Sequence, residues 1–412
     1  MANNRWKRSL GRVLALAVVA LTVCAAGHAA PRYKVLHAFG AGKDGAGLWG
    51  SVALDKKGNL YGATSGGGAY GQGIVFRLTP RPGGNWTESI LHNFPSSLHD
   101  GEGPNGGLLQ DDSGIWYGTT AGGGAYYLGT VFQLKHGSGG WVENILYSFG
   151  THSDDGYEPA AGLAMDKRGN LYGTAPQPWS TAFELTPGSG GWDETIMHHF
   201  GVSKGDGAGP YAGLILDAVG NLYGTTEGGG NECGSSGCGT VYELSPEPNG
   251  KWKEAVLHRF DNNGHDGFTP GFGTLVLDGS GSLYGTTAGG GCCGGVVYQL
   301  TPGASGRWNE TILYDFKGGS KGFEPGAGVV MDKAGNSYGT TIYGGSGCDC
   351  GVVYKLAPTR SGKWKYTVLH TFVGSDGAQP RANLILDDKG NLYGTTITGG
   401  AYGGGVVFEL TP

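Results

Sequence analysis

One six-residue segment recurs seven times along the chain with only small changes. The tyrosines of this segment follow one another at a nearly constant spacing, and they are Tyr61, Tyr117, Tyr172, Tyr223, Tyr284, Tyr338 and Tyr393. A period of roughly 55 residues is too long for an ankyrin or leucine-rich repeat and suits one four-stranded propeller blade with long loops. The repeat therefore predicts a series of similar β units.

Each period contains four strand-like runs bounded by turn residues. In the fourth copy we expect them at residues 213–217, 221–226, 240–245 and 252–260. The link between the first two runs carries Asp and Gly in most copies, which is typical of a short antiparallel hairpin. The link after the third run begins with Pro, which ends a strand. No stretch shows helical periodicity.

The two ends of the mature chain complement each other. Residues 33–39 read as a fourth strand without its first three, and residues 405–412 read as a third strand without its fourth. Six full repeats and these two fragments make seven units. If the first strand completes the last unit, no sheet edge stays open at the join. We therefore predict an all-β fold, a seven-bladed β-propeller of four-stranded blades over residues 31–412, closed by the N-terminal strand.

The fourth strand of each blade carries a repeated histidine. Strict alternation in residues 86–94 would place Glu88, Ile90 and His92 on one face. The equivalent position holds His37, His198, His258 and His370, and Tyr147 and Tyr314 replace it in two copies. A position that accepts His or Tyr on a packed face is best explained by a half-buried ring with a polar tip. We therefore expect a structural role and no metal site.

Residues 1–30 are predicted to be a signal peptide. Four basic residues precede an apolar stretch at 13–23 that is too short to span a bilayer. Without it the chain has 24 basic and 34 acidic residues, a balance of −10 that argues against nucleic acid and anionic membranes as partners. No later run is long enough to cross a membrane. We expect a monomer that is secreted, periplasmic or held at the cell surface.

The repeat pattern DGxxP…GLxxDxxGNLYGTT…GG…GTVFxLTP…WxExxLxxF resembles the GloVer, or choice-of-anchor, tandem-repeat family of exported bacterial proteins. The resemblance covers nearly the whole mature chain. It implies a secreted or surface β-propeller whose relatives often carry a C-terminal anchor, and it brings no catalytic residues. Because this sequence ends at Thr411-Pro412 without a sorting tail, we expect surface attachment only if Cys24 is lipidated, and we favour its removal with the signal.

The links on one side of the propeller carry the candidate chemistry. The link before each first strand contains Asp-Gly, with Lys321 breaking the pattern, and its aspartates are Asp44, Asp100, Asp155, Asp206, Asp266 and Asp376. A ring of carboxylates around the central channel could hold a cation. Asp-Gly is also favourable turn chemistry, and we favour that interpretation.

The links between second and third strands divide into two groups of neighbouring blades. Those of copies 1, 2, 3 and 7 carry aromatic residues, which are Tyr70, Tyr126, Tyr127, Trp179 and Tyr402. Tyr and Trp offer large flat surfaces to a sugar or a protein. The alternative, that these rings pack on their own loops, stays open. We name the five residues the rim aromatics and treat them as ligand-binding candidates.

The links of copies 4, 5 and 6 contain all six cysteines of the mature chain. An even set in an exported chain indicates disulfides. Equivalent points on adjacent blades are too far apart for a bridge, so pairing within each loop is favoured. The expected pairs are Cys233–Cys238, Cys292–Cys293 and Cys348–Cys350, and a zinc or copper site is the less favoured alternative because no histidine shares these loops.

Motifs of common enzymes are absent from the sequence. No G-x-S-x-G segment leads from a strand into a predicted helix, as a nucleophile elbow requires, and there is no H-E-x-x-H and no phosphate-cradling loop. Our leading hypothesis is an exported, non-catalytic recognition or scaffold module without a cofactor, which binds carbohydrate or a cell-envelope partner. The alternatives are a polysaccharide lyase or hydrolase, a quinone-dependent oxidoreductase, or a purely structural envelope component.

Overall fold

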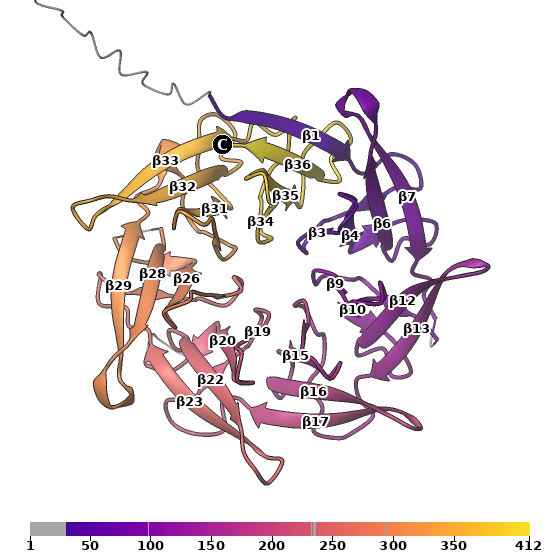
Figure 1. Cartoon of the computed structure of the whole chain (residues 1–412), viewed down its shortest axis with the longest axis horizontal. Helices are drawn as coiled ribbons and strands as arrows, with labels where there is room; N and C mark the ends of the chain where they lie inside the picture. Colours follow the sequence, from indigo (N-terminus) through magenta and orange to yellow (C-terminus); the bar gives the residue numbers. More distant parts are fainter. Residues whose placement is uncertain (1–29, 98, 232, 234–235, 293) are drawn as a thin grey trace, which may run out of the picture. The chain divides into compact units, whose positions relative to one another are not determined.

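The computed structural model describes residues 30–412 except positions 98, 232, 234–235 and 293. These described residues form seven four-stranded antiparallel sheets arranged around a central axis (Figure 1). The predicted seven-bladed β-propeller is therefore confirmed. Of the predicted signal peptide, residues 1–29 lie outside the described part, and so does Cys24. Among the described residues, no helix has the length and apolar character needed to cross a membrane.

Each blade runs from a short inner strand to a long outer strand. The inner strands have two residues each, and they are β3 (Ala53–Leu54), β9 (Leu109–Gln110), β14 (Ala164–Met165), β19 (Ile215–Leu216), β25 (Val276–Leu277), β30 (Val330–Met331) and β34 (Ile385–Leu386). The second strands hold the repeated segment, and they are β4 (Leu60–Thr64), β10 (Trp116–Thr120), β15 (Leu171–Ala175), β20 (Leu222–Thr226), β26 (Leu283–Thr287), β31 (Ser337–Thr341) and β35 (Leu392–Thr396).

The two outer positions of each blade form a long hairpin. The third strands are β6 (Ile74–Pro80), β12 (Thr130–Gly137), β16 (Thr181–Gly188), β22 (Thr240–Pro246), β28 (Val296–Pro302), β32 (Val352–Pro358) and β36 (Val406–Thr411). The fourth strands are β7 (Trp86–Asn93), β13 (Gly140–Ser148), β17 (Gly191–His199), β23 (Trp252–Arg259), β29 (Trp308–Asp315), β33 (Trp364–Thr371) and β1 (Arg32–Ala38). Short 3-10 turns are η1 (Pro82–Gly84), η2 (Ala304–Gly306) and η3 (Gly319–Lys321).

The ring closes as the sequence predicts. Strand β1 pairs antiparallel with β36, from Arg32 opposite Thr411 to Ala38 opposite Val406, and the last sheet has the order β1-β36-β35-β34. Figure 1 shows the first and last strands side by side. A hydroxyl also joins the two ends of the chain, since Thr395 Oγ1 donates to the Gly50 carbonyl at 3.2 Å. The N-terminal strand therefore completes the seventh blade.

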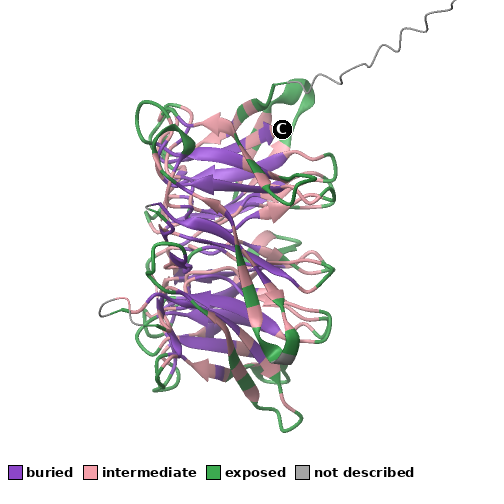
Figure 2. Cartoon of the chain, turned by 90° about the vertical axis from the view of Figure 1, so that its left-hand side faces the viewer, coloured by how far each residue is buried: buried purple, intermediate pink, exposed green. Residues whose placement is uncertain are grey.

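The apolar core lies between neighbouring blades, where the strands are buried and the loops exposed (Figure 2). At every interface a phenylalanine that follows an outer strand packs on an aromatic ring of the next blade's third strand, with ring centroids 4.7 to 5.4 Å apart. Such aromatic pairs stabilise beyond their buried area. The pairs are Phe39–Phe76, Phe94–Phe132, Phe149–Phe183, Phe200–Tyr242, Phe260–Tyr298, Phe316–Tyr354 and Phe372–Phe408.

Every position of the repeated segment has a structural task. In the first blade Leu60 is fully buried, and the Tyr61 hydroxyl donates to Asp55 of the preceding turn at 3.3 Å. A Cβ on Gly62 would lie 2.6 Å from the Phe76 ring, closer than real Cβ contacts come. The segment is therefore repeated because each blade needs the same packing, and it carries shape rather than chemistry.

The penultimate residue of the segment connects blades near the axis. Its threonine hydroxyl donates to a backbone carbonyl of the next blade at five interfaces, through Thr119, Thr174, Thr286, Thr340 and Thr395. The hydroxyl of Thr225, at the equivalent place in the fourth blade, is buried and has no hydrogen-bond partner in the described part of the chain. The repeat therefore contains its own comparison between a bonded and an unbonded hydroxyl.

We expect Thr286→Val to lower the free energy of unfolding by about 1–2 kcal/mol, because it removes a buried 2.8 Å bond to the Ala327 carbonyl and leaves that carbonyl unpaired. Thr225→Val is the matched control and should be neutral or slightly stabilising, since its hydroxyl bonds to nothing. Urea denaturation of both variants measures the difference. Equal losses in both would contradict this reading of the repeat.

One expectation about the outer strands is wrong. A β-bulge interrupts the pairing of β6 with β7, where the register shifts between Val75 and Phe76. An extra residue reverses the alternation of side chains beyond it. Glu88 therefore faces His37 of the preceding blade, whereas His92 faces Asp100 and the following blade. All seven outer hairpins carry this bulge.

Candidate ligand-binding face

The links that precede the inner strands and those that join second to third strands meet on one face, which we call the loop face. Short two-stranded ladders connect them in four blades: β2 (Gly45–Ala46) with β5 (Gly66–Gly67), β8 (Gly101–Glu102) with β11 (Gly122–Gly123), β18 (Gly207–Ala208) with β21 (Gly228–Gly229), and β24 (Gly267–Phe268) with β27 (Gly289–Gly290). All five rim aromatics are exposed, between 51% for Tyr126 and 65% for Tyr70. Their rings therefore do not fold down onto their own loops.

Seven side-chain positions, one from each blade, surround a cavity of about 260 Å³ at the centre of the loop face. We call them the mouth residues, and they are Trp49, Asn105, Ala160, Tyr211, Phe272, Gly326 and Arg381. Trp49 and Phe272 are 43% and 42% exposed, which is high for such large apolar side chains. Tyr211 lies beside Phe272 with ring centroids 5.9 Å apart. The mouth is therefore an aromatic cavity open to solvent.

The mouth also contains polar atoms without partners. The Arg381 guanidinium lies over the Trp49 ring, 5.5 Å from its centroid. Arg381 Nε and Asn105 Oδ1 are buried and have no hydrogen-bond partner among the described residues. A buried donor and a buried acceptor that lack partners are costly unless a ligand or water satisfies them. The mouth therefore offers one donor, one acceptor and aromatic surface to a ligand.

A groove of about 660 Å³ adjoins the mouth, since Tyr211 lines both cavities. Its lining combines proline, alanine and glycine with two aromatic rings, and its polar side chains include Gln177, Ser180, Glu227 and Asn262. Gln177 donates to the Tyr211 hydroxyl at 2.8 Å and so fixes the boundary between groove and mouth. Burial raises the pKa of Glu227. The loop that forms one wall, at residues 176–180, also carries Trp179.

The inner strands enclose a further cavity of about 490 Å³ along the axis. Its lining is mostly Val, Leu, Ile, Ala and Gly, with Ser51, Thr274 and Asn383 as its polar members. None of the Asp-Gly carboxylates is among the described residues that line this cavity or the mouth. The carboxylate ring around the channel is therefore not formed, because these aspartates turn outward to the boundaries between blades.

Two of the three expected cysteine pairs are present. Cys233 and Cys238 form a disulfide with Cα atoms 5.1 Å apart, and Cys348 and Cys350 form another at 5.2 Å. Both separations lie within the range that a disulfide allows. The predicted Cys292–Cys293 pair falls partly on a position outside the described residues. Each observed disulfide closes a single loop of the loop face.

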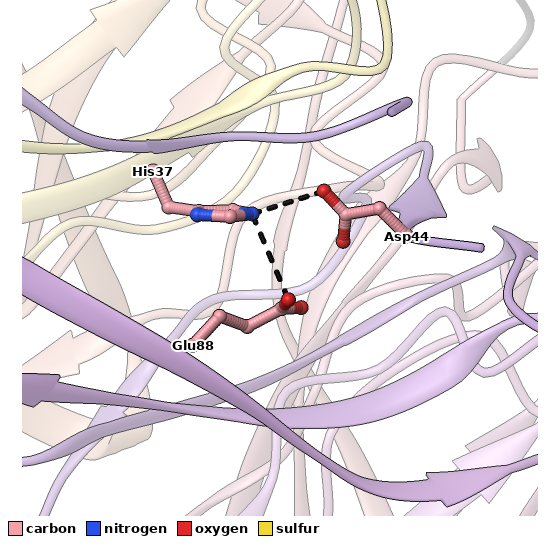
Figure 3. Close-up of side chains that lie close together, drawn as sticks. All are labelled: His37, Asp44 and Glu88. Carbon is pink, nitrogen blue, oxygen red and sulfur yellow. Dashed lines mark hydrogen bonds and ion pairs between the residues drawn. The ribbon is translucent and has the colours of Figure 1, made fainter. Parts of the chain in front are cut away.

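The repeated histidines lie at the boundaries between blades, in side-chain groups that we call blade junctions. At the first, His37 of β1 points at Asp44 of the following link and at Glu88 of β7 (Figure 3). His37 Nε2 is 3.0 Å from Asp44 Oδ2 and 4.0 Å from Glu88 Oε2. Burial, and then the nearby Asp44, raise the pKa of Glu88 to about 7, although His37 lowers it. The histidines are half-buried, as the sequence predicts.

The same arrangement recurs around the ring with substitutions. His92, His198 and His258 repeat the group, each with an Asp of the link and a Glu of the next outer strand. At the third junction the Tyr147 hydroxyl replaces the imidazole and bonds Asp155 at 2.8 Å and Glu194 at 3.0 Å. At the seventh, the Tyr33 ring replaces the Glu and stacks on His370 at 3.7 Å. His and Tyr therefore serve one geometric role, which is to join two blades.

A family model described as the Gloeobacter/Verrucomicrobia repeat matches residues 22–234, 175–347 and 231–412. The chain belongs to this repeat family. The seven blades are thus the structural form of the Gloeobacter/Verrucomicrobia repeat in this chain. No curated protein gives a significant match to it.

Solved structures share the fold of this repeat-family chain at low identity. An ancestral GH74 enzyme has a TM-score of 0.58 at 12% identity, over 90% of this chain and 48% of the enzyme. PorZ of Porphyromonas gingivalis, described as an essential bacterial surface component of the type-IX secretion system, has a TM-score of 0.51 at 16% identity, over 90% of this chain and 47% of PorZ. The chain thus spans about half the length of both. At such identities the likeness shows the propeller fold alone.

Sequence reasoning missed the mouth residues, although the repeat contains a signal for them. Each lies six positions before the Asp that starts the turn between first and second strands, as Trp49 precedes Asp55 and Arg381 precedes Asp387. The two positions beside each mouth residue are small or apolar in nearly every copy of this family's repeat, whereas the mouth position itself varies from Gly to Trp. A variable position inside a regular repeat indicates a surface that is not needed for the fold.

Proposed function

We propose that this propeller is an exported, non-catalytic recognition module that binds an oligosaccharide on its loop face. The end unit of the sugar chain occupies the mouth, and the following units lie in the groove beyond Tyr211. The observation that carries the proposal is the pairing of exposed aromatic rings with buried polar atoms that lack partners.

The chemistry of the mouth matches that of a sugar. Trp49 and Phe272 offer flat apolar surfaces on which the C–H faces of a pyranose can stack. Arg381 Nε donates and Asn105 Oδ1 accepts, so the two atoms suit hydroxyl groups, which do both. Few, well-placed polar groups among apolar walls are typical of small-molecule sites.

The dimensions of the two cavities indicate an extended ligand. At about 260 Å³ the mouth is smaller than the range of roughly 300–1,000 Å³ that is usual for whole drug-sized ligands. The adjoining groove has about 660 Å³ and is open to hydrogen bonding along its walls. A chain that enters end-on and continues along the face uses both cavities.

The lining supports binding rather than hydrolysis. Most glycoside hydrolases use two carboxylates that flank the scissile bond. Among the described residues that line the mouth and the groove, Glu227 is the only carboxylate. A single half-buried acid does not make such a pair, so the likeness in fold to a GH74 enzyme does not favour that activity here.

Export is part of the proposal. The disulfides Cys233–Cys238 and Cys348–Cys350 support an oxidising compartment such as the periplasm or the exterior. The rim aromatics extend the binding surface, and the exposed Trp179 lies between Pro178 and Ser180, which line the groove. A cell-envelope glycan or a secreted polysaccharide is the ligand that such a location supplies.

A glycan array with the mature chain tests the proposal. We expect at least one oligosaccharide to bind, and Trp49→Ala or Phe272→Ala to weaken its binding by roughly five- to thirtyfold in calorimetry, since each removes a stacking surface worth about 1–2 kcal/mol. Val219→Ala is the control, because Val219 is 80% exposed in the turn between the first and second strands of its blade. Tyr70→Ala and Trp179→Ala measure the contribution of the rim aromatics. An array without binding, or mouth variants that bind normally, would overturn the proposal.

A further inference from the structure

Four blade junctions share one constellation of possible metal ligands. Each brings an imidazole nitrogen and two carboxylate oxygens within 4.8 Å of one another. The histidine and the glutamate come from the outer strands of adjacent blades, and the aspartate comes from the link between them. The four groups are His37–Asp44–Glu88, His92–Asp100–Glu143, His198–Asp206–Glu254 and His258–Asp266–Glu310.

We propose that these four junctions bind divalent transition-metal ions of the zinc class, one ion at each, and that the ions clamp adjacent blades together. This proposal is independent of the oligosaccharide site, because no junction residue lines the mouth or the groove. It goes beyond the structural role that the sequence predicts for the histidines.

The separations of the ligand atoms fit a tetrahedral ion. Ligands at about 2.0–2.2 Å from a tetrahedral centre lie roughly 3.4 Å from one another. At the His258 junction, His258 Nε2 is 3.4 Å from Asp266 Oδ2 and 3.8 Å from Glu310 Oε1. At the first junction the corresponding distances from His37 are 3.0 and 4.0 Å. At these two junctions, shifts of up to about 0.6 Å would therefore centre an ion.

A second observation points to a ligand at the same place. Among the described residues, no hydrogen-bond partner is found for the buried atoms His258 Nε2 and Glu310 Oε1. The equivalent Oε1 atom is likewise buried and unpartnered, within the described part of the chain, in Glu88, Glu143 and Glu254, and also in Glu194 at the Tyr147 junction. The orphaned glutamate oxygen is thus shared by junctions with and without a histidine, and among the described residues only the His258 junction has an unpartnered imidazole nitrogen as well. Metal coordination would satisfy these atoms.

The donor set selects the class of metal. One imidazole nitrogen with two carboxylate oxygens is a set that Zn²⁺ accepts, with a fourth position left for water. Calcium requires six to eight oxygen ligands and does not favour nitrogen, so it fits poorly. The aspartate side chains at these junctions are at most 12% exposed, which screens the bound ion from solvent.

The remaining junctions provide comparisons within the same chain. Tyr147 stands in place of histidine beside Asp155 and Glu194, and Lys321 stands in place of the aspartate beside Tyr314 and Tyr366. Tyr33 stands in place of the glutamate at the junction of His370. These three lack the full donor set, so four ions per chain are expected.

Equilibrium dialysis of the metal-stripped mature chain against Zn²⁺, with metal analysis, tests the stoichiometry. We expect four zinc ions per chain and a rise in melting temperature that EDTA reverses. His258→Tyr should lower the count to three, and it installs the residue that already serves at the Tyr147 junction. Tyr147→His should raise the count to five, because Asp155 and Glu194 complete the set.

Two results would overturn the proposal: no zinc bound by the natural chain, or a count that stays the same in both variants. In a further variant, the histidines of all four proposed sites become tyrosine, and this variant should retain no tightly bound zinc. It separates the proposed sites from surface histidines such as His99 and His265. Calcium in place of zinc should leave the melting temperature unchanged, and an equal rise with calcium would also contradict the assignment. Far-UV circular dichroism and size-exclusion chromatography check that each variant is folded.

Discussion

Deleting residues 31–39 is expected to abolish the stable monomeric fold, although it removes a single strand. The segment supplies β1, which pairs with β36 along its length, and it buries Leu36 and Phe39. Burying each of these side chains contributes about 1.5–3 kcal/mol, and the Phe39 ring also packs at a tilt against Phe76 of the first blade. The free energy of unfolding should therefore fall by about 5 kcal/mol or more, which is a large part of the roughly 5–15 kcal/mol of a typical domain. Size-exclusion chromatography and thermal unfolding measure the outcome.

The deletion should also aggregate, because it exposes the full edge of β36 to pairing with other chains. A permuted chain is the matched control: residues 31–39 are moved behind Pro412 through a copy of the natural link at residues 359–363. Since β36 and β1 would then form an outer hairpin like those of the other blades, this chain should recover the monomer and most of its melting temperature. A deletion variant that melts like the natural chain would contradict the closure of the ring by β1.

Raising the pH from 5 to 9 is expected to destabilise the protein through Glu194, by about 4 kcal/mol at that residue. Burial, and then the charge of Asp155, raise the pKa of Glu194 to about 8 from an ordinary value of 4.5. A raised pKa in the folded chain gives stability that is complete below the ordinary value and is lost as the pH rises through the folded one. Each pKa unit corresponds to about 1.4 kcal/mol, which sets this magnitude. Urea denaturation in EDTA across this pH range measures the slope.

Glu194→Gln should lower the slope, with the remainder left to glutamates such as Glu88, and should be more stable than the natural chain at pH 9, because the neutral amide never ionises. It keeps a donor and an acceptor for Tyr147 and Asp155. Asp112→Asn, which changes an exposed carboxylate, is the control and should leave the slope unchanged. If Glu194→Gln loses stability with pH as steeply as the natural chain, Glu194 is not the group responsible.

The structure changes how the histidines of the outer strands are understood. From the sequence each is a half-buried ring on a face shared with the preceding glutamate. The bulge in each hairpin places His92 and Glu88 on opposite sides instead, so that each glutamate meets the histidine of the previous blade. The resulting His–Asp–Glu groups could not be predicted, because the location of a bulge depends on packing between blades rather than on the local pattern.

The loops show a similar division between what the sequence predicts and what it misses. The pairs Cys233–Cys238 and Cys348–Cys350 followed from short loops and the spacing of blades. The exposure of the rim aromatics was one of two alternatives until the structure showed it. The variable position that supplies the mouth residues could have been found by comparing the repeat copies. That these seven residues surround one cavity follows only from the closed ring of blades.

By itself, the sequence determined the number of blades, the order of strands in each, the closure by the first strand and the pairing of cysteines within loops. These features depend on local periodicity and on counting, because every repeat must bury the same side chains. Only the tertiary structure decided which side chains meet at the axis and at the blade junctions. Trp49 belongs to the first repeat and Arg381 to the last, and such contacts are set by the rotation from one blade to the next, which no single repeat encodes.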